Sequence, residues 1–597
     1  MLRIIKAIGL VFGDIGTSPI YTLTVVFLLL PPTKENVLGV LSIIFWTLII
    51  IPTLQYTVLA MSLSLRGEGG TFILFQILRG LLTSKRNISV VALLSFVGIS
   101  LLMGDGVITP AISILSAVEG ISYVPGLRPL TEMEVVFISM FIALALFTFQ
   151  SRGTETVSGT FGPIMSIWFG SLFLLGFLNI IKMPEILKAI SPHYIIQFFQ
   201  NNGWKAYLVL GETILCATGS EAMYADMGHL GAKPIKQAWK LVFIALITNY
   251  FGQGAYLLLN PETKSVLFEM CLGTLSFYYV PFLIITLLAT IIASQAMISG
   301  MFSIIYQAIT ARILPIFKVK YTSAELPSQI YIPTINWLLF LAVSFIMYEF
   351  KSSSSLAGAY GLAVTGDMTI TGIFLITIFY LKKRFSFMNI AIFTTIITFI
   401  YFTSTLFKFP YGGYWAVVLA SLPLSIILLY TNGQKRLYRF TKFLSKEDFI
   451  NKFERFYATN PKIPGTALFL IRDPSVFPPY VIETLFFHGI IYEENIFLSL
   501  IRKNEPYGIT TGFLQPLCNG AKVFEIAYGY MEILKVEEIL RENGIEERVI
   551  FYGLEEIQTS SPLWKLYAFI KQISPHFVKF LDLPPTKLHG VLTRLSM

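Results

Sequence analysis

A long apolar segment at the start of the chain, residues 4–30, is interrupted by the stretch Gly9-Leu-Val-Phe-Gly-Asp14-Ile-Gly-Thr-Ser-Pro19-Ile-Tyr21. A carboxylate at bilayer depth costs roughly 2.5 to 3.5 kcal/mol on insertion scales, so its retention indicates a substrate or ion pathway. The glycines and Pro19 break the helix and free backbone carbonyls, for which a bound cation is a suitable partner. This segment predicts a transporter rather than a plain membrane anchor.

The composition of the whole chain is that of a membrane protein. Hydrophobic residues make up 55% and charged residues 13% of the 597, whereas about 25% of residues are charged in soluble domains. The net charge of +9 comes with Lys and Arg residues in short loops, where they orient a membrane protein. We therefore expect contact with membrane lipid and no nucleic-acid partner. Cys216, Cys271 and Cys518 have no paired spacing, so neither a disulfide framework nor a zinc site is indicated.

About 12 segments contain the roughly 20 apolar residues that one bilayer crossing requires. They are 4–30, 38–64, 88–118, 134–150, 160–181, 203–228, 234–259, 277–311, 333–350, 356–381, 387–407 and 412–430. If they alternate with the N-terminus inside, the inside loops hold about twice as many Lys and Arg residues as the outside loops, in agreement with the positive-inside rule. This predicts a multi-pass protein of the cytoplasmic (inner) cell membrane with both termini in the cytoplasm.

The character of the chain changes after Tyr430. Basic residues follow at once, and no later segment is long and apolar enough to cross a bilayer. We expect a transmembrane transport domain over 1–430 and a cytoplasmic C-terminal domain over 431–597. Strands are predicted at 466–472 and 496–501, and a helix over 531–543 that ends at Gly544, which gives an α/β domain. It contains neither a Walker-type loop nor a catalytic constellation, so an enzyme is not predicted.

The interrupted first span has a counterpart in the sixth, where Thr218, Glu221 and Asp226 lie among glycines in an apolar stretch. Broken helices at corresponding positions of two halves indicate an inverted-repeat transporter with its binding site at the midplane. The halves are spans one to five and six to ten. The predicted fold is an all-α polytopic membrane protein of the five-plus-five leucine-transporter (APC) type with two extra helices.

The third and tenth spans also carry polar motifs. Asp105, Thr109 and Ser113 recur every four residues, so their side chains share one helix face that can line a cavity. Glu119 follows near the end of that span, and the tenth span contains Tyr360-Gly-Leu-Ala-Val-Thr-Gly-Asp367.

Four stretches resemble the signature motifs of the Kup/HAK/KT potassium uptake permeases. They are Gly13-Asp-Ile-Gly-Thr-Ser-Pro-Ile-Tyr21, Gly104-Asp-Gly-Val-Ile-Thr-Pro110, Glu221-Ala-Met-Tyr-Ala-Asp-Met-Gly-His229 and Ala359-Tyr-Gly-Leu-Ala-Val-Thr365. The resemblance covers about 9 to 430 and, more weakly, the tail. It implies potassium uptake coupled to protons by alternating access in the cytoplasmic membrane. It also implies a homodimer formed partly through the cytoplasmic domains.

The resemblance implies a cation site by motif position. The residues are Asp14, Tyr21, Thr109, Ser113, Thr218 and Tyr360. Sites for potassium replace its hydration shell with several neutral oxygens and few formal charges, which fits this set. For proton coupling we favour Glu221, followed by Asp105 and Glu119, because a carboxyl in an apolar cavity titrates closer to neutrality than in water. Beyond the transported K⁺ and H⁺, we expect no cofactor and no bound metal.

Each of these residues also has a simpler structural interpretation. Asp14 suits a helix cap, the hydroxyls suit bonds to their own preceding turn, and the tyrosines suit packing. Asp105 suits a solvated helix end. Asp367 departs from the pattern of the family, which usually has a neutral residue, so we leave it out of the cation site. An amino-acid or other organic-solute transporter of the same fold is the alternative function, although Asp14 would repel an anionic group.

Overall fold

The computed structural model describes residues 2–65, 67–152, 155–321, 330–503, 507–529, 532, 534–576, 578, 581 and 583–596. The chain forms two compact units. The first contains residues 1–304 and 319–424, and the second contains residues 305–318 and 425–597. The second unit thus begins slightly before the boundary expected at 430, and it includes a short segment from between two membrane helices.

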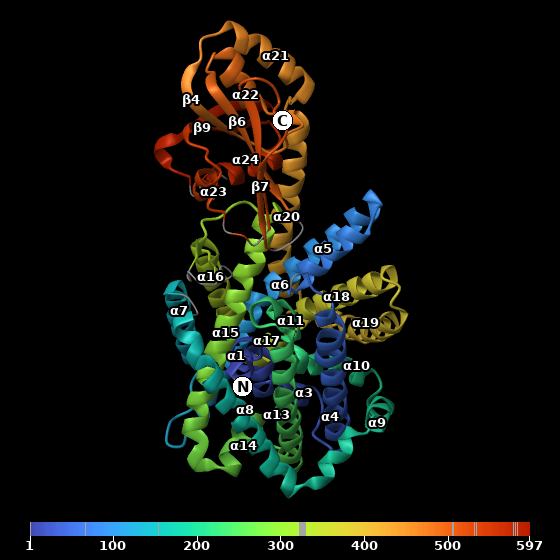
Figure 1. Ribbon diagram of the computed structural model, residues 1–597. Coiled ribbons are helices and arrows are strands. Elements are labelled where there is room, and N and C mark those ends of the chain that lie inside the picture. The colour runs from blue at the N-terminus through green and yellow to red at the C-terminus, as the bar shows by residue number, and fades with distance from the viewer. Residues whose placement is uncertain are drawn as a thin grey trace. The chain divides into compact units, whose positions relative to one another are not determined.

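The first unit is helical (Figure 1). Within the described part of the chain, ten helical segments are long and apolar enough to cross a membrane. They are Lys34–Ser62, Lys85–Tyr123, Glu132–Phe149, Gly159–Lys182, Ala232–Leu259, Ser276–Thr310, Pro333–Phe350, Ser353–Leu381, Phe385–Leu406 and Tyr414–Phe440. Each corresponds to one predicted span, which confirms a multi-pass helical membrane protein.

The segments predicted as spans one and six are divided into shorter helices. The first consists of α1 (Leu2–Val11), α2 (Gly13–Thr17), the 3₁₀ turn η1 (Ser18–Ile20) and α3 (Thr22–Leu29). The sixth consists of α10 (Trp204–Thr213), η7 (Ile214–Ala217), α11 (Ser220–Ala225) and α12 (Met227–Leu230). The glycines and the proline that predicted interruptions therefore do interrupt these helices.

The remaining helices of this unit carry the labels of Figure 1. They are α4 (Lys34–Leu48), the π-helical segment η2 (Ile49–Leu59), α5 (Thr71–Leu81), α6 (Lys85–Glu119), α7 (Glu132–Phe149), α8 (Glu155–Lys182), α9 (His193–Asn202), α13 (Ala232–Leu259), α14 (Val266–Thr274), α15 (Tyr279–Thr310), α16 (Pro333–Phe350), α17 (Ser353–Ala359), α18 (Leu362–Leu381), α19 (Phe385–Leu406) and α20 (Tyr414–Phe440).

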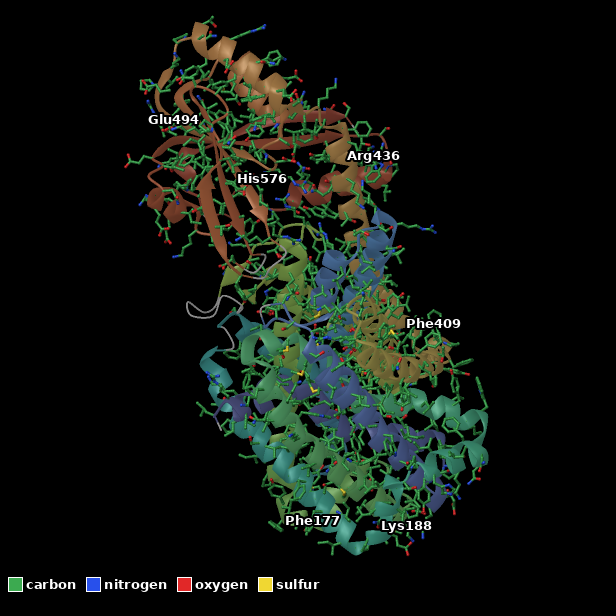
Figure 2. All side chains as sticks on the ribbon, turned by 45° about the vertical axis from the view of Figure 1, so that its right-hand side comes forward. Phe177, Lys188, Phe409, Arg436, Glu494 and His576 are labelled. Carbon is green, nitrogen blue, oxygen red and sulfur yellow. The ribbon has the colours of Figure 1, made fainter. Side chains whose placement is uncertain are left out.

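Large apolar side chains cover much of the outer surface of these helices. Phe141 is 71% exposed, and Phe177 and Phe409 are 47% and 44% exposed; Figure 2 shows the last two at the periphery of the helices. A soluble protein rarely exposes so many aromatic side chains. This surface is suited to lipid.

Small residues bring the inner helices together. A Cβ added at Gly252 of α13 would lie 2.3 Å from the Cα of Gly176 on α8. Only glycine permits this backbone approach, which is typical of helix contacts in membranes. The close contact holds α8 and α13 together beside the broken first helix, against which both also pack.

The second unit is an α/β domain built on a six-stranded sheet in the order β10-β9-β4-β6-β8-β7. Its strands are β4 (Ile463–Ile471), β6 (Tyr492–Arg502), β7 (Ile509–Phe513), β8 (Ala521–Tyr528), β9 (Glu547–Gln558) and β10 (Leu588–Ser596). All neighbouring strands are parallel except β7 and β8. Buried apolar clusters formed around Phe469 and around Leu468 lie on opposite faces of the sheet, because successive strand residues alternate.

The helices of this domain are α21 (Lys446–Thr459), α22 (Pro479–Ile482), α23 (Val536–Glu542) and α24 (Pro562–Ile573). The predicted strand at 496–501 lies within β6, and the one at 466–472 coincides with β4 except for Arg472, so the α/β prediction is confirmed. The predicted helix over 531–543 is shorter, since α23 begins at Val536; Met531 lies outside the described residues.

Candidate functional site

The break in the first span is positioned by Pro19. Proline lacks an N–H and sits at the start of η1, where the chain passes from α2 to a 3₁₀ turn. Two carbonyls at this break have side-chain partners: Trp168 Nε1 donates to Gly16 O at 2.9 Å, and Gln253 Nε2 donates to Pro19 O at 3.0 Å. Side chains of α8 and α13 thus occupy these two carbonyls, for which the sequence suggested a bound cation as the partner.

The break in the sixth segment lies directly against the first. Thr218 is extended, and Gly219 has a φ of +79°, a left-handed conformation that glycine adopts without strain. A Cβ on Gly219 would lie 2.8 Å from both Cβ and Oδ2 of Asp14. The absence of a side chain at Gly219 therefore makes the room in which the Asp14 carboxyl lies.

The Asp14 carboxyl is buried and has no protein donor. Its exposed fraction is 5%, and neither oxygen accepts a hydrogen bond from any described residue. The side chain also does not cap a helix, so the capping interpretation is wrong. A buried carboxylate without donors is costly unless a positive charge or a proton compensates it. A cation or a proton at the Asp14 carboxyl would supply that compensation.

Hydroxyl groups from four segments gather beside this carboxyl. Ser18 Oγ lies 3.1 Å from Thr218 Oγ1 and 3.5 Å from the Tyr21 hydroxyl, which joins the two broken segments. Thr109 Oγ1 lies 2.9 Å from the Tyr360 hydroxyl. The hydroxyls of Tyr21 and Tyr360 are both within electrostatic range of Asp14. Five of the six predicted cation-site residues therefore lie in one buried region.

Two of the predicted residues differ from the rest. Ser113 is fully buried, and its hydroxyl has no hydrogen-bond partner among the described residues, so no hydrogen bond joins it to the other five. Thr218 does bond its own preceding turn, donating to Leu215 O at 2.9 Å, as the simpler interpretation expected. It still touches Ser18, so that bond does not remove it from the group.

The three predicted proton carriers differ in their surroundings. Glu221, in the first turn of α11, is buried with both carboxyl oxygens unbonded in the described structure, and it lies within electrostatic range of Asp14. Asp105 is fully buried rather than solvated at a helix end, and one of its oxygens accepts a hydrogen bond from Thr109 at 3.2 Å. These two carboxyls and Asp14 form one electrostatically connected group.

Glu119 lies apart from this group. Its carboxyl accepts a hydrogen bond from the backbone N–H of Ser353 at 2.7 Å and another from the Ser353 hydroxyl. Both contacts are at the N-terminus of α17, where a carboxylate satisfies helix donors. The structure thus gives Glu119 a helix-capping position.

Ser18 and Gly219 were not predicted as parts of this region, and Asp367 was deliberately left out of the cation site. Ser18 and Gly219 stand inside the quoted motifs, next to a break, and that position was the available signal. Asp367 is buried on α18 and lies within electrostatic range of Glu221. The sequence shows that Asp367 lies within span ten, but it does not show which side chains surround it.

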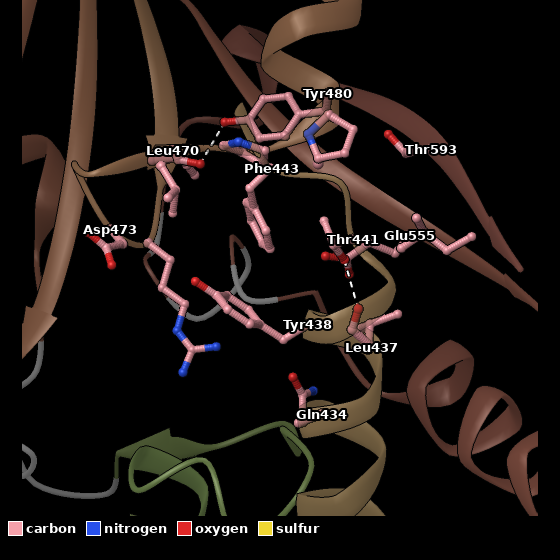
Figure 3. Close-up of a pocket in the computed structure, with 16 residues that line it drawn as sticks. Gln434, Leu437, Tyr438, Thr441, Phe443, Leu470, Asp473, Tyr480, Glu555 and Thr593 are labelled. Carbon is pink, nitrogen blue, oxygen red and sulfur yellow. Dashed lines mark hydrogen bonds between the residues drawn. The ribbon is translucent and has the colours of Figure 1, made fainter. Parts of the chain in front are cut away.

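The C-terminal domain has pockets of its own. One of about 200 Å³ is lined by Tyr438, Arg472 and Tyr480, with the Tyr480 hydroxyl donating to Leu470 O at 2.6 Å (Figure 3). A second pocket of about 310 Å³ shares Arg472 and is also lined by Arg312. Burial, and after it the charge of Arg472, lowers the pKa of the Arg312 guanidinium. This concentration of positive charge favours an anionic occupant over a cation.

Both parts of the chain match models of known protein families. Residues 1–435 match the K⁺ potassium transporter integral membrane domain, and residues 464–597 match the K⁺ potassium transporter C-terminal domain. Among curated proteins, the chain is 52% identical over 594 residues to a probable potassium transport system protein Kup of Methanosarcina acetivorans, covering 100% of this chain and 98% of that protein. A protein of the same name from Methanosarcina barkeri is 53% identical over 595 residues, with 100% and 99% covered.

Among solved structures, the chain is similar to the manganese transporter of Eremococcus coleocola, in a mutant form and in complex with an aromatic bis-isothiourea substituted compound. Each comparison has 11% sequence identity and a TM-score of 0.38, and covers 72% of this chain and 92% of the other. A likeness this weak carries no argument about the site.

Proposed function

This chain belongs to the K⁺ potassium transporter family, and from that premise we infer that it takes up potassium across the cytoplasmic membrane as a K⁺:H⁺ symporter. It is a transporter and not an enzyme, like the potassium transport proteins that it resembles along its whole length. The organic-solute alternative is not favoured, because the buried Asp14 carboxyl would repel an anionic substrate group.

The proposal rests mainly on the Asp14 carboxyl, which lies where the breaks of the first and sixth segments face each other. It supplies one formal charge, and the hydroxyls of Tyr21, Thr109, Thr218 and Tyr360 supply neutral oxygens nearby. Such a mixture suits a large, weakly hydrated monovalent cation. We include Ser113 in the cation site as well, since its buried hydroxyl is without a partner in the described structure.

Proton coupling is assigned first to Glu221, then to Asp105, and last to Glu119. Glu221 and Asp105 lie in the electrostatic group with Asp14, so a proton on one changes the affinity of that group for a cation. No ion pair of the described residues involves these three carboxyls. A potassium ion and protons are therefore the charges available to compensate them.

Alternating access follows from the broken helices, since α1 to α3 and α10 to α12 provide hinge points on both sides of the site. We further propose that both termini are cytoplasmic, in keeping with the positive-inside rule, and that the protein is a homodimer joined through its cytoplasmic domains.

The experiment that tests the proposal is potassium uptake into proteoliposomes by the wild type and by Asp14→Asn. The substitution keeps the shape of the side chain and removes its charge, so uptake falls to background while the purified protein remains monodisperse. The matched control is Glu185→Gln, which neutralises an exposed carboxylate paired with Lys34 and leaves uptake unchanged. Undiminished uptake by Asp14→Asn would remove Asp14 from the site.

A further inference from the structure

The helix α24 of the C-terminal domain carries a stripe of large apolar side chains that is open on the surface of its unit. The stripe consists of Leu563, Leu566, Phe569 and Ile573, which are 55%, 51%, 57% and 65% exposed. At 3.6 residues per turn, their spacing places them within about 120° of the helix circumference. An exposed apolar patch of this kind marks a surface that binds a protein partner or a membrane.

Another side of α24 packs against α20; Figure 1 labels both helices. The side chain of Tyr567 is fully buried, and a Cβ added to Gly433 of α20 would lie 2.4 Å from its ring. The ring centroids of Tyr430 and Tyr567 are 6.2 Å apart, and the Arg436 guanidinium lies 5.0 Å from the centroid of the Trp564 ring. All of these residues belong to the second unit. Their contacts hold α24 against one short stretch of α20.

This stretch of α20 is the place where the membrane-spanning helix leaves its apolar part. The apolar run of α20 ends at Tyr430, and residues 431–436 are Thr-Asn-Gly-Gln-Lys-Arg. Gly433 is three residues beyond Tyr430, which corresponds to about 4.5 Å of helix rise. The polar headgroup layer on each side of a bilayer is about 5 to 8 Å thick. The contacts between α20 and α24 therefore correspond to headgroup depth.

The side chains around the stripe are those of a helix that lies in a membrane interface. Such helices combine Leu, Phe and Trp on one side with basic residues on the other, and they bind anionic lipid. Lys565 of α24 is exposed, as are Lys435 and Arg439 of α20. Lys571 is not available in the same way, because it pairs with Glu555. The exposed basic side chains complement the negative charge of lipid headgroups.

A second copy of the chain fits the stripe less well than lipid does. Stable protein interfaces bury about 1,200 to 2,000 Å², and four side chains on one helix of 12 residues offer only a part of that area. The stripe is instead continuous with a membrane-spanning helix, through the contacts of Tyr567 with Tyr430 and Gly433. Its position and its charge both favour lipid as the occupant.

We propose that α24 is an interfacial helix, which lies in the headgroup layer of the leaflet that α20 leaves and inserts its apolar stripe among the lipid chains. The C-terminal domain is thereby docked on the lipid surface as well as tethered by α20. This inference goes beyond the proposed transport function and does not depend on the identity of the ion or on proton coupling.

The test is the depth of a nitroxide label in the full-length protein, reconstituted in vesicles of phosphatidylcholine and phosphatidylglycerol. Labels are placed singly at Leu566→Cys and Phe569→Cys in a Cys518→Ser background, because Cys216 and Cys271 are buried. Collisions with oxygen, which enters lipid, are compared with collisions with a water-soluble nickel chelate present on both sides of the membrane. The matched control is Lys452→Cys, at an exposed position of α21, which Figure 1 shows well apart from α24.

The expected result is a ratio of oxygen to nickel collisions that is several-fold higher at both α24 positions than at the control. Leu563→Glu with Leu566→Glu, two changes at exposed positions that leave the domain core intact, lowers the ratio at Phe569→Cys to the control value. Equal ratios at α24 and the control would overturn the proposal. So would labels that are shielded from both reagents, with spin–spin broadening if a second copy covers the stripe and without it if another part of the chain does.

Discussion

Asp14 and Gly219 are 205 positions apart in the sequence, yet the Asp14 carboxyl lies where a side chain on Gly219 would be. Gly219 is left-handed, and any Cβ there would meet Asp14 and the N–H of Ile15 at 2.8 Å. The proposed cation site thus depends on Gly219 because this residue has no side chain. Conformational freedom and space are both required at this position.

We predict that Gly219→Ala abolishes potassium uptake. The added methyl group forces the two breaks apart and adds the strain of a left-handed alanine, about 1 to 3 kcal/mol. Gly170→Ala is the matched control, because a Cβ at Gly170 on α8 meets nothing within 4 Å and alanine favours a helix. Uptake by both variants in proteoliposomes checks this; full uptake by Gly219→Ala would show that Asp14 and Gly219 do not form one site.

The C-terminal domain offers a residue-scale prediction about pH. Burial, and after it the charge of Glu454, raises the pKa of the Cys518 thiol to about 11. The thiolate is the reactive form, so alkylation of Cys518 by iodoacetamide rises about tenfold per pH unit between pH 7 and 10. Mass spectrometry of the native protein measures the rate, with Cys518→Ser as the unlabelled control. A rate that levels off near pH 8.5 would contradict the raised pKa.

At the scale of elements, an ion pair fixes the segment that precedes Tyr360. Lys408 Nζ, just after α19, lies 2.7 Å from Glu212 Oε2 on α10, and their side chains are only 10% and 8% exposed. Lys408 also donates a hydrogen bond to Ala357 O at 3.3 Å, near the end of α17. Three elements that lead to Tyr360 and Thr218 are thereby held together.

We predict that Lys408→Met lowers the free energy of unfolding by about 3 to 5 kcal/mol, because it leaves the Glu212 charge buried and uncompensated. The double variant Lys408→Met, Glu212→Met regains most of that loss, since no charge is then left unpaired. Equilibrium unfolding of the purified variants in mixed micelles measures both. Equal stability of the single variant and the wild type would mean that the pair contributes nothing.

Much of the element structure could be predicted from sequence. Apolar run length is a local property, so ten spans and the two interrupted segments were all recognisable. Pro19 and the glycines of the two motifs indicated where the breaks lie. The pairing of Lys408 with Glu212 could not be predicted, because it joins residues far apart along the chain. Lys408 follows an apolar span in the sequence, and only the packing of α10, α17 and α19 shows that it is buried.

Some features of the candidate site could likewise be predicted from the sequence, and others could not. Asp14, Tyr21, Thr109, Thr218 and Tyr360 were predicted from motifs and do lie in one region. Glu119 was predicted near the end of a span as the third proton carrier, and its carboxyl accepts hydrogen bonds at the start of α17. Asp367 was visible in the sequence, but its hydrogen bond with Thr71 and its proximity to Glu221 depend on how α5, α11 and α18 meet. The composition of the chain does not determine these helix contacts.

At the scale of the whole molecule, the chain combines a helical membrane unit with an α/β unit, and each closes its own core. The membrane unit contains the buried carboxyls to which we assign transport. The α/β unit contains a pocket lined by Arg312 and Arg472. The proposed transport site lies in the membrane unit alone.

We propose that potassium moves together with protons. Potassium flux into proteoliposomes that contain the purified protein tests this directly. The membrane voltage is clamped with an ionophore, and an inward proton gradient is then imposed. The account predicts that potassium uptake increases with the gradient and that Glu221→Gln abolishes the increase. Uptake that is indifferent to the gradient would contradict it and would indicate a uniporter.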